Sequence, residues 1–245
     1  MIKKTTVFLF FILMSSLLFA QQSNNFVVLE LFTSEGCSSC PEADKLLSEI
    51  SNEAKLKNQN IYCLAYHVDY WNKLGWKDPF SKFQFTRRQE NYSRVLPSKE
   101  LYTPQMVVNG TTETVGSNKE RTKTTIDQAM SKKKEGQLSL KVDSIDGDTA
   151  FLSWNLSRQD KNFVLQIAFT QNGLRSNVTK GENEGKNLKH DHVVRSFSAV
   201  NNPGVTGQIK FLIREKDPLL ESEFIAFLQN KQNYSILLAT RVKLK

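Results

Sequence analysis

Hydrophobic and polar positions follow two different patterns along this chain. Up to Glu135, short apolar runs alternate with segments in which apolar residues recur at helical spacing. From Leu138 onward, apolar and polar residues mostly alternate, and turn signals separate the runs. The first pattern is typical of α/β structure and the second of a β-sandwich. We therefore predict an α/β domain over residues 21–136, ended by a helix-terminating Gly136, and a sandwich-like all-β domain over residues 137–245.

Within the first domain, the pattern predicts alternating strands and helices. The run NFVVLELF is almost continuously apolar, as expected of a buried central strand. From Cys40 onward the apolar positions repeat every three or four residues, which predicts a helix with Pro41 in its first turn. The expected order is strand 25–32, a helix from Cys40, strand 61–71, a helix opened by Asp78-Pro79, a hairpin turning at Asn109-Gly110, and a helix opened by the capping box Ser117–Glu120.

The first twenty residues have the layout of a secretory signal peptide. The segment MIKKTTVFLFFILMSSLLFA carries two lysines, then an apolar stretch too short to span a bilayer comfortably, then a small residue. Cleavage after Ala20 leaves Gln21 first, which is not the cysteine of a lipoprotein. We therefore predict residues 1–20 as a signal peptide and a periplasmic or extracellular, soluble mature protein without stable membrane insertion. An uncleaved N-terminal anchor is the alternative.

Charge adds little to this picture. The formal net charge of +8 falls to +6 once Lys3 and Lys4 are removed with the signal peptide. So small an excess, spread over several segments, is typical of a solvated basic surface. Together with the predicted export, it leads us to expect no nucleic-acid partner.

Two of the three cysteines, Cys37 and Cys40, form a C-x-x-C pair where the first strand gives way to the helix. This spacing serves metal sites, structural disulfides and redox centres alike. A helix N-terminus lowers the pKa of a thiol to about 3.5–7.5, so Cys37, expected to be exposed there, is the predicted attacking thiol. Cys40, one turn inside, is expected to resolve the mixed disulfide. A structural bridge is disfavoured because closing so short a loop gains little chain entropy.

The order of elements, together with CSSC and TPQMVV, resembles the thioredoxin superfamily over residues 25–135. The resemblance implies a central mixed sheet flanked by helices and a cis bond at Thr103-Pro104 that faces the disulfide. It also implies a buried acid on the first strand, here Glu30, that relays a proton to the inner cysteine. The stretch from Glu30 to Cys37 is one residue longer than in thioredoxins. A carboxylate in a polar pocket or paired with a lysine is the alternative.

A narrower resemblance covers nearly all of the predicted mature chain. The segments LELFTSEGCSSCPEAD, HVDYWNKLGWKDPF and YTPQMVVNG look like an exported bacterial family of thioredoxin-like proteins catalogued only as a domain of unknown function. The likeness continues through GENEGKNLKHDHVVR in the second domain. It implies a fold and a chemistry but no substrate.

The end of the second strand supplies candidates for a substrate groove. His67, Asp69, Tyr70 and Trp71 are expected to approach the cysteines, because this strand lies beside the first one. His67 titrates near neutral pH or ligates a metal under one interpretation, and is a satisfied structural histidine under the favoured one. Cys63, on the same strand, is interpreted as a small buried hydrophobe.

A metal centre is the weaker alternative for the cysteines. Cys37, Cys40 and His67 together suit Cu(I), which prefers thiolates, whereas structural zinc wants four ligands and a second C-x-x-C is missing. The His190-Asp191-His192 segment is expected on a strand of the other domain. We therefore predict no cofactor beyond the redox-active disulfide.

The second domain contains one long polar, glycine-bearing stretch, GLRSNVTKGENEGKNLKHDHVVR. Such stretches often carry binding on a β scaffold, so we hypothesise that it docks a partner beside the redox site; a plain connection between strands is the alternative. The sequence thus predicts an exported thiol–disulfide oxidoreductase that exchanges with protein or small-molecule thiols or disulfides and with a redox partner in the cell envelope. A non-enzymatic binding module with an inert disulfide is the rival.

Overall fold

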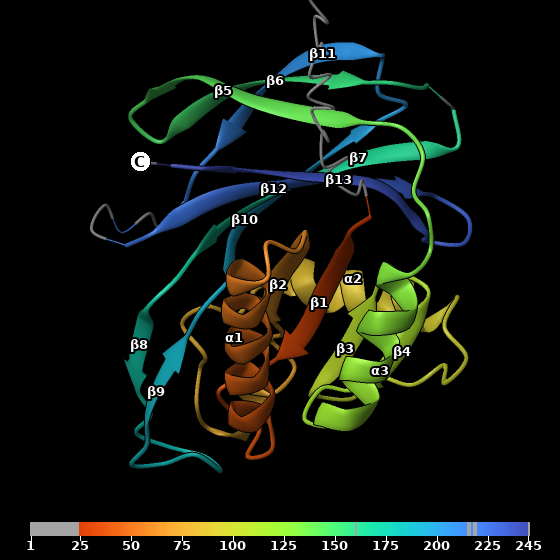
Figure 1. Cartoon of the computed structure of the whole chain (residues 1–245). Helices are drawn as coiled ribbons and strands as arrows, with labels where there is room; N and C mark the ends of the chain where they lie inside the picture. The colour runs from red at the N-terminus through yellow and green to blue at the C-terminus, as the bar shows by residue number, and fades with distance from the viewer. Residues whose placement is uncertain (1–24, 160, 215–216, 218–219, 245) are drawn as a thin grey trace, which may run out of the picture.

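The computed structural model describes residues 25–159, 161–214, 217 and 220–244. The predicted signal peptide therefore lies outside the described residues. Figure 1 labels the elements along the chain. The helices are α1 (Cys40–Leu56), the short 3-10 helix η1 (Asn72–Leu74), α2 (Phe83–Ser93) and α3 (Lys119–Met130). The strands are β1 (Val27–Thr33), β2 (Ile61–His67), β3 (Gln105–Val108), β4 (Thr112–Val115), β5 (Leu138–Asp146), β6 (Thr149–Leu156), β7 (Phe163–Gln171), β8 (Leu174–Asn177), β9 (Asn187–His190), β10 (Val193–Asn201), β11 (Thr206–Leu212), β12 (Ser222–Asn230) and β13 (Ile236–Lys243).

One mixed sheet of eight strands runs through the molecule in the order β13-β12-β7-β10-β2-β1-β3-β4. β1 and β2 are parallel, whereas β3 runs antiparallel to β1 and forms the predicted hairpin with β4 at Asn109-Gly110. β7 lies between β10 and β12 and is antiparallel to both. A three-stranded sheet, β11-β6-β5, and the separate hairpin β8-β9 complete the described strands.

The predicted fold class, a thioredoxin-like α/β domain followed by a separate all-β sandwich, is wrong. The eight-stranded sheet overturns it, because β1 to β4 come from one half of the chain and β7, β10, β12 and β13 from the other. The halves join where Val193 of β10 pairs with Ala65 of β2, whose N–H donates to the carbonyl of His192 at 2.8 Å. An uncovered β2 edge would leave unpaired backbone groups, and this pairing satisfies part of them. The proposed domain boundary at Gly136 stays a prediction.

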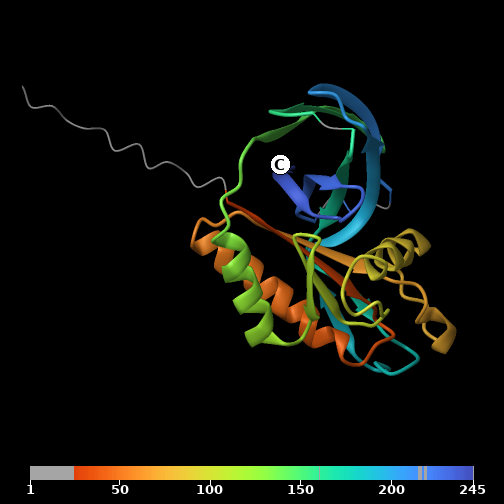
Figure 2. The ribbon, with the colours of Figure 1, turned by 90° about the vertical axis from the view of Figure 1, so that its right-hand side faces the viewer.

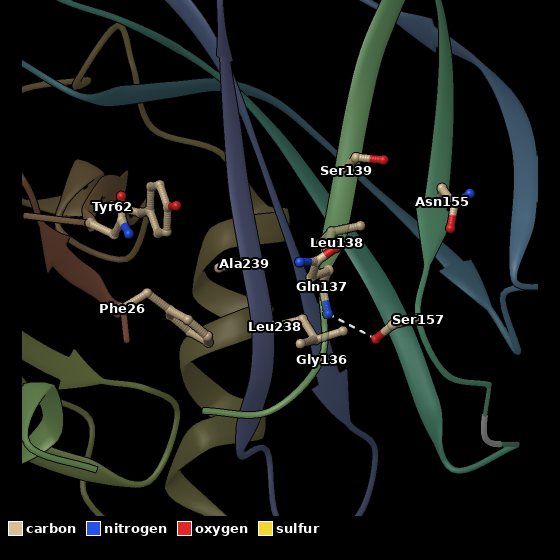
Figure 3. Close-up of a pocket in the computed structure, with 11 residues that line it drawn as sticks. Phe26, Tyr62, Gly136, Gln137, Leu138, Ser139, Asn155, Ser157, Leu238 and Ala239 are labelled. Carbon is tan, nitrogen blue, oxygen red and sulfur yellow. Dashed lines mark hydrogen bonds between the residues drawn. The ribbon is translucent and has the colours of Figure 1, made fainter. Parts of the chain in front are cut away.

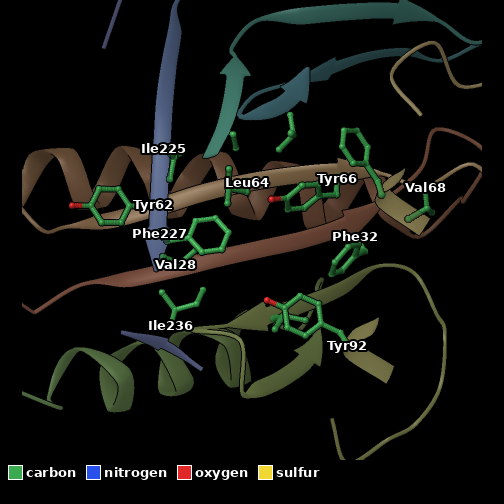
Figure 4. Packing of buried hydrophobic residues seen from close by; sticks show 14 of the residues in the cluster. Val28, Phe32, Tyr62, Leu64, Tyr66, Val68, Tyr92, Ile225, Phe227 and Ile236 are labelled. Carbon is green, nitrogen blue, oxygen red and sulfur yellow. The ribbon is translucent and has the colours of Figure 1, made fainter. Parts of the chain in front are cut away.

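Alternating residues of β1 bury two different faces of the sheet. Val27, Leu29 and Leu31 pack with α1 and α3 on one face. Val28 and Phe32 belong to a second cluster on the opposite face, where side chains of α2, β7, β12 and β13 meet them (Figure 4). A third cluster lies between the large sheet and β5, β6 and β11, which curve over it in Figure 2. The C-terminal strands therefore share with α2 the face of the sheet opposite to α1 and α3.

A buried ion pair lies inside the second cluster. The Glu30 side chain points to this face, where the Nε of Arg88 and the hydroxyl of Tyr92, both on α2, donate to its two carboxylate oxygens. Gln229 of β12 joins them, donating to the Tyr92 hydroxyl at 2.8 Å and accepting from Arg88 Nη2 at 3.3 Å. The guanidinium also lies 4.9 Å from the ring centre of Phe197 on β10. The pair thus ties β1, α2, β10 and β12 together.

Replacing Glu30 by glutamine is expected to destabilise the fold by about 3–5 kcal/mol, because the buried Arg88 guanidinium would lose its counter-charge. Denaturant unfolding measures the loss. The matched control is Glu49→Gln, which breaks an exposed pair with Lys119 and should cost far less, because water screens that pair. Equal losses in the two variants would contradict a structural role for the Glu30 pair.

Candidate functional site

The two cysteines form a disulfide at the point where α1 begins. Cys40 is the first residue of α1, and Cys37 lies in the preceding loop with its Cα 5.4 Å from that of Cys40. Ser39 is at the N-cap position, and its Oγ lies 3.4 Å from Cys37 Sγ. Ala43 and Leu47 hold α1 on the sheet through the apolar cluster shared with β1 and β2. The predicted pairing at a helix mouth is confirmed.

Cys37, however, is not at the surface. Its side chain is 1% exposed and that of Cys40 is fully buried, whereas Ser38 and Ser39 between them are exposed. The expectation of an exposed attacking thiol is therefore wrong for this conformation. Helix α1 begins where the sequence predicts, but a segment from the other half of the chain covers its N-terminus.

The covering segment is the loop 178–186, which connects β8 and β9. In Figure 1 this hairpin runs beside α1 to the end at which the helix begins. The fully buried Asn183 donates from Nδ2 to the carbonyls of Glu35, at 2.8 Å, and Cys37, at 2.9 Å. Glu182 accepts from the backbone N–H of Ser38 at 2.9 Å. The polar stretch singled out in the sequence thus lies directly on the cysteine loop.

The predicted cis bond between Thr103 and Pro104 is confirmed. A Cβ built on Gly116 would lie 3.1 Å from Pro104 Cβ and 3.2 Å from Ala43 Cβ, so the cis-proline lies near the first turn of α1. The indole of Trp71 donates to Thr103 Oγ1 at 2.8 Å. Trp71 Cβ is also 3.0 Å from the position of a Cβ on Gly36, in the loop before Cys37. Trp71 therefore connects the cysteine loop to the Thr103-Pro104 segment.

The remaining groove candidates have structural partners. Tyr70 is partly buried, with its ring centre 6.4 Å from that of Trp71. Asp69 accepts a hydrogen bond from Thr86 of α2. His67 is fully buried; its Nδ1 lies 2.7 Å from Asp78 Oδ2, whereas its Nε2 has no hydrogen-bond partner among the described residues, so the predicted satisfied histidine holds for one ring nitrogen. Of the four candidates, Trp71 is the one shown to contact both the cysteine loop and Thr103.

A buried charged cluster of Glu35, His190 and Asp44 adjoins the disulfide. His190, at the end of β9, has Nε2 3.0 Å from Glu35 Oε1 and Nδ1 3.2 Å from Asp44 Oδ2. The three side chains are 1%, 2% and 8% exposed. Glu35 also accepts from the indole of Trp76 at 2.8 Å and from the hydroxyl of Ser176 at 3.0 Å. The cluster therefore joins the cysteine loop, α1 and the β8-β9 hairpin.

His190 is held in its charged form by this arrangement. Burial alone would lower the pKa of its imidazole, but the two carboxylates outweigh burial and raise the pKa to about 10. In the neighbouring pair, burial would raise the pKa of Asp78, but His67 and two backbone N–H groups bring it below its ordinary value. The rings of His67 and His190 meet edge to face with centres 4.8 Å apart, so the two pairs form one polar interior.

Glu30, the predicted proton relay, has a different environment. It lies on the face of β1 opposite to α1, since its neighbours Leu29 and Leu31 pack with that helix. The structure pairs it with Arg88, in line with its alternative interpretation as a paired acid, although the partner is an arginine rather than a lysine. The extra residue between Glu30 and Cys37 is the sequence signal of this change of face.

Neither Cys63 nor a metal centre adds to the site in the part of the chain that the structure describes. Cys63 is a free, buried thiol whose pKa is raised to about 12 chiefly by burial. Within the described residues, no group of three or more His, Cys, Asp and Glu side chains is arranged to hold a metal ion. The same part of the chain contains no helix long and apolar enough to cross a membrane.

A cavity of about 450 Å³ lies elsewhere, between the starts of β1 and β5 and the strand β13 (Figure 3). Its lining mixes neutral polar and apolar residues, with the Gln137 N–H donating to Ser157 Oγ at 2.8 Å. Phe26 and Tyr62 supply its aromatic wall. Neither disulfide cysteine nor any predicted groove residue is among the described residues that line it.

The sequence interpretation missed Glu35, Asp44, Asn183 and His190. Asp44 had a detectable signal, because it is a carboxylate on the apolar face of a helix, one turn after Cys40. The sequence predicts His190 on a strand of the other domain and includes Asn183 only within the polar stretch hypothesised to dock a partner, whereas it assigns no site role to Glu35 or Asp44. The pairing of His190 with Glu35 spans 155 residues of sequence, which periodicity cannot reveal.

Comparisons with known proteins add a family and a fold. A family model described as "Protein of unknown function (DUF1223)" matches residues 28–229. A crystal structure of a protein from Agrobacterium tumefaciens is similar, with 24% identity and a TM-score of 0.66 over 90% of this chain and 94% of that one. Two further structures match only weakly. A β-glucosidase from Kluyveromyces marxianus has 14% identity and a TM-score of 0.22 over 46% of this chain and 14% of that one. A β-glucuronidase from Bacteroides uniformis has 13% identity and a TM-score of 0.19 over 45% of this chain and 13% of that one. No match was found among curated proteins. The chain therefore belongs to the DUF1223 family.

Proposed function

We propose that this chain is an exported thiol–disulfide exchange protein whose reacting pair is Cys37 and Cys40. The observation that carries the proposal is a disulfide between Cys37 and Cys40 at the first turn of α1, the helix that also supplies Asp44 of the buried charged cluster. The helix N-terminus favours a thiolate at Cys37, and Ser39 Oγ, 3.4 Å from its sulfur, can donate to it. The likeness of CSSC and TPQMVV to thioredoxins supports the chemistry and not the fold.

The exchange step follows from these positions. In the reduced protein, the Cys37 thiolate attacks one sulfur of a partner disulfide, an S–S bond forms between them, and the other partner sulfur leaves as a thiolate. Cys40 then loses its proton and attacks Cys37, which restores the Cys37–Cys40 bond and releases the second partner sulfur. The partner gains two electrons and leaves as two thiolates, which take up protons from water, while the Cys37–Cys40 pair loses two electrons and the Cys40 proton. The same steps run backward when the protein oxidises a partner dithiol.

We propose that the charged cluster of Glu35, His190 and Asp44 accepts the proton that Cys40 loses. Asp44 lies four residues after Cys40 on the same buried face of α1, and its Oδ1 has no hydrogen-bond partner within the described residues. The cluster contains one more carboxylate than imidazolium, so it can accept a proton without creating a buried positive charge. Ser176, partly exposed, connects Glu35 to the surface. Asp44 is thus the proposed acceptor, and His190 and Glu35 position it.

A binding module with an unreactive disulfide is the second candidate. The observation that favours it is the burial of Cys37, which keeps the sulfur from a partner in this conformation. In that case the cysteines only fasten the loop to α1. Redox measurements on the chain from Gln21 onward separate the two functions.

The Cys37–Cys40 pair is expected to titrate reversibly in glutathione buffers, between about −270 and −120 mV, as exchange proteins do. Trapping free thiols and weighing the protein gives the oxidised fraction. Cys37→Ser is expected to abolish turnover of a dithiol or disulfide substrate, whereas Cys63→Ser, the control at the buried free thiol, retains it. A disulfide that no glutathione buffer in this range reduces, or turnover that survives Cys37→Ser, would favour the binding module.

Asp44→Asn is expected to slow closure of the disulfide by about 10²-fold, because a positioned base typically contributes that much. The rate of the variant should rise with hydroxide concentration as Cys40 ionises unaided, a pH profile that a merely structural change does not produce. Glu42→Gln, an exposed acid in the same helical turn, is the control and should leave the profile unchanged. An unaltered profile in Asp44→Asn would remove this residue from the mechanism.

The charge on His190 has its own test in stability. The folded pKa of about 10 lies above the ordinary 6.5, so the cluster's contribution is complete below pH 6.5 and is lost as pH rises through 10. The free energy of unfolding should therefore fall on the order of a few kcal/mol across that window. His190→Gln is expected to flatten this decline. A wild-type curve as flat as that of the variant would contradict a charged His190.

A further inference from the structure

Loop 178–186 occupies backbone groups that an exchange partner would need. Its Asn183 donates hydrogen bonds to the carbonyls of Glu35 and Cys37, and its Glu182 accepts one from the N–H of Ser38. These are two acceptors and one donor on the short, irregular segment that carries the reacting sulfur. Unpaired backbone groups of this kind are what an extended peptide engages when it adds itself to a protein edge.

The β8-β9 hairpin is attached to the protein differently at its tip, residues 181–185, and at its root, where β9 ends. At the root, Asp191 accepts from Gly173 N–H at 2.8 Å and from Ser48 of α1 at 2.9 Å, and His190 lies in the charged cluster. At the tip, two side chains form the hydrogen bonds to the cysteine loop: Asn183 donates to the carbonyls of Glu35 and Cys37, and Glu182 accepts from Ser38. The tip is therefore the part that can leave with the hairpin still in place.

The conformation of the tip supports this division. Gly181 and Gly185 adopt φ values of +81° and +79°, and they flank the three residues 182–184. The side of Gly181 that a Cβ would occupy faces Trp76 Cβ at 3.5 Å and the carbonyl of Leu74 at 3.8 Å. Leu74 is 51% exposed. Lifting the tip therefore uncovers backbone of the cysteine loop beside a partly exposed apolar edge.

We propose that loop 178–186 is a lid latched by Asn183, and that it stands in for an extended polypeptide segment that bears the reacting cysteine of the partner. When the lid opens, the segment takes over the hydrogen bonds of Glu182 and Asn183 and rests against Leu74 and Trp76. Its sulfur then reaches Cys37. The identity of the partner as a cysteine-bearing segment rests on the proposed exchange function. The opening of the lid does not depend on that function.

The first measurement is the alkylation rate of Cys37 in the reduced chain with iodoacetamide, followed by mass at that cysteine. Asn183→Ala removes both latch hydrogen bonds and is expected to accelerate alkylation about tenfold or more. Asn187→Ala, which breaks an exposed amide pair with Asn177 in the same hairpin, is the matched control and should leave the rate unchanged. Equal rates in wild type and Asn183→Ala would overturn the lid.

The second measurement uses exchange with a disulfide-bearing peptide and with oxidised glutathione. In Asn183→Ala the rates should rise for both, because the lid that covers Cys37 opens more often. Glu182→Gln, an exposed substitution that is expected to fold normally, should show a smaller acceleration of alkylation. Faster alkylation without any exchange would retain the lid and contradict the exchange function. Exchange with unchanged alkylation would retain the function and contradict the lid.

Discussion

The pairing of β10 with the edge of β2 is the constraint on which the rest of this structure depends. The pairing is short: Val193 lies opposite Ala65, and the Ala65 N–H donates to the carbonyl of His192. Yet it makes one sheet from two halves of the chain, and it fixes where β9 ends. Because β9 ends there, His190 reaches Glu35 and Asp44, and the loop before β9 reaches the cysteines. The site therefore belongs to both halves.

Burial of charge explains why the arrangement is specific. A buried carboxylate is costly unless it is paired and hydrogen-bonded, and the interior beneath the disulfide contains Glu35, Asp44 and Asp78. Each has a histidine partner, and the histidines come from β2 and β9. A slip of either strand by one residue would point its histidine to the opposite face and leave the acids unpaired. Register of the sheet and charge balance of the site are thus fixed together.

Local patterns in the sequence were sufficient for the elements around the cysteines. The apolar run predicted β1, helical spacing predicted α1, and Asn109-Gly110 predicted the β3-β4 turn, because each depends on neighbours a few residues away. The capping box Ser117–Glu120 predicted α3, but the N-cap is Asn118, which accepts from the N–H of Arg121. The helix opened by Asp78-Pro79 was misplaced, since α2 begins at Phe83. Asp78 instead accepts from the N–H of Phe80 and pairs with His67, so its carboxylate serves the interior and not a helix cap.

Contacts between distant segments were beyond the reach of those patterns. A thioredoxin-like order of elements predicted a sheet flanked by helices and an exposed Cys37, yet strands from the second half pack beside α2 on one face, and loop 178–186 covers Cys37. Polar, glycine-bearing stretches are ordinary connections in most sequences, and nothing in residues 178–186 themselves specifies the surface on which they lie. The decisive partners, the carbonyls of Glu35 and Cys37, are backbone groups that every residue possesses.

The burial of the disulfide and its proposed reactivity are compatible because the hairpin is fastened unevenly. Its root is held by the ion pairs of His190 and by Asp191 on Ser48, which a small movement would leave as unpaired buried charges. Its tip is held by a few hydrogen bonds that water can replace at little cost. Thermal opening is therefore directed to the tip, the segment that covers Cys37. The cluster that would take the Cys40 proton stays assembled while the sulfur becomes accessible.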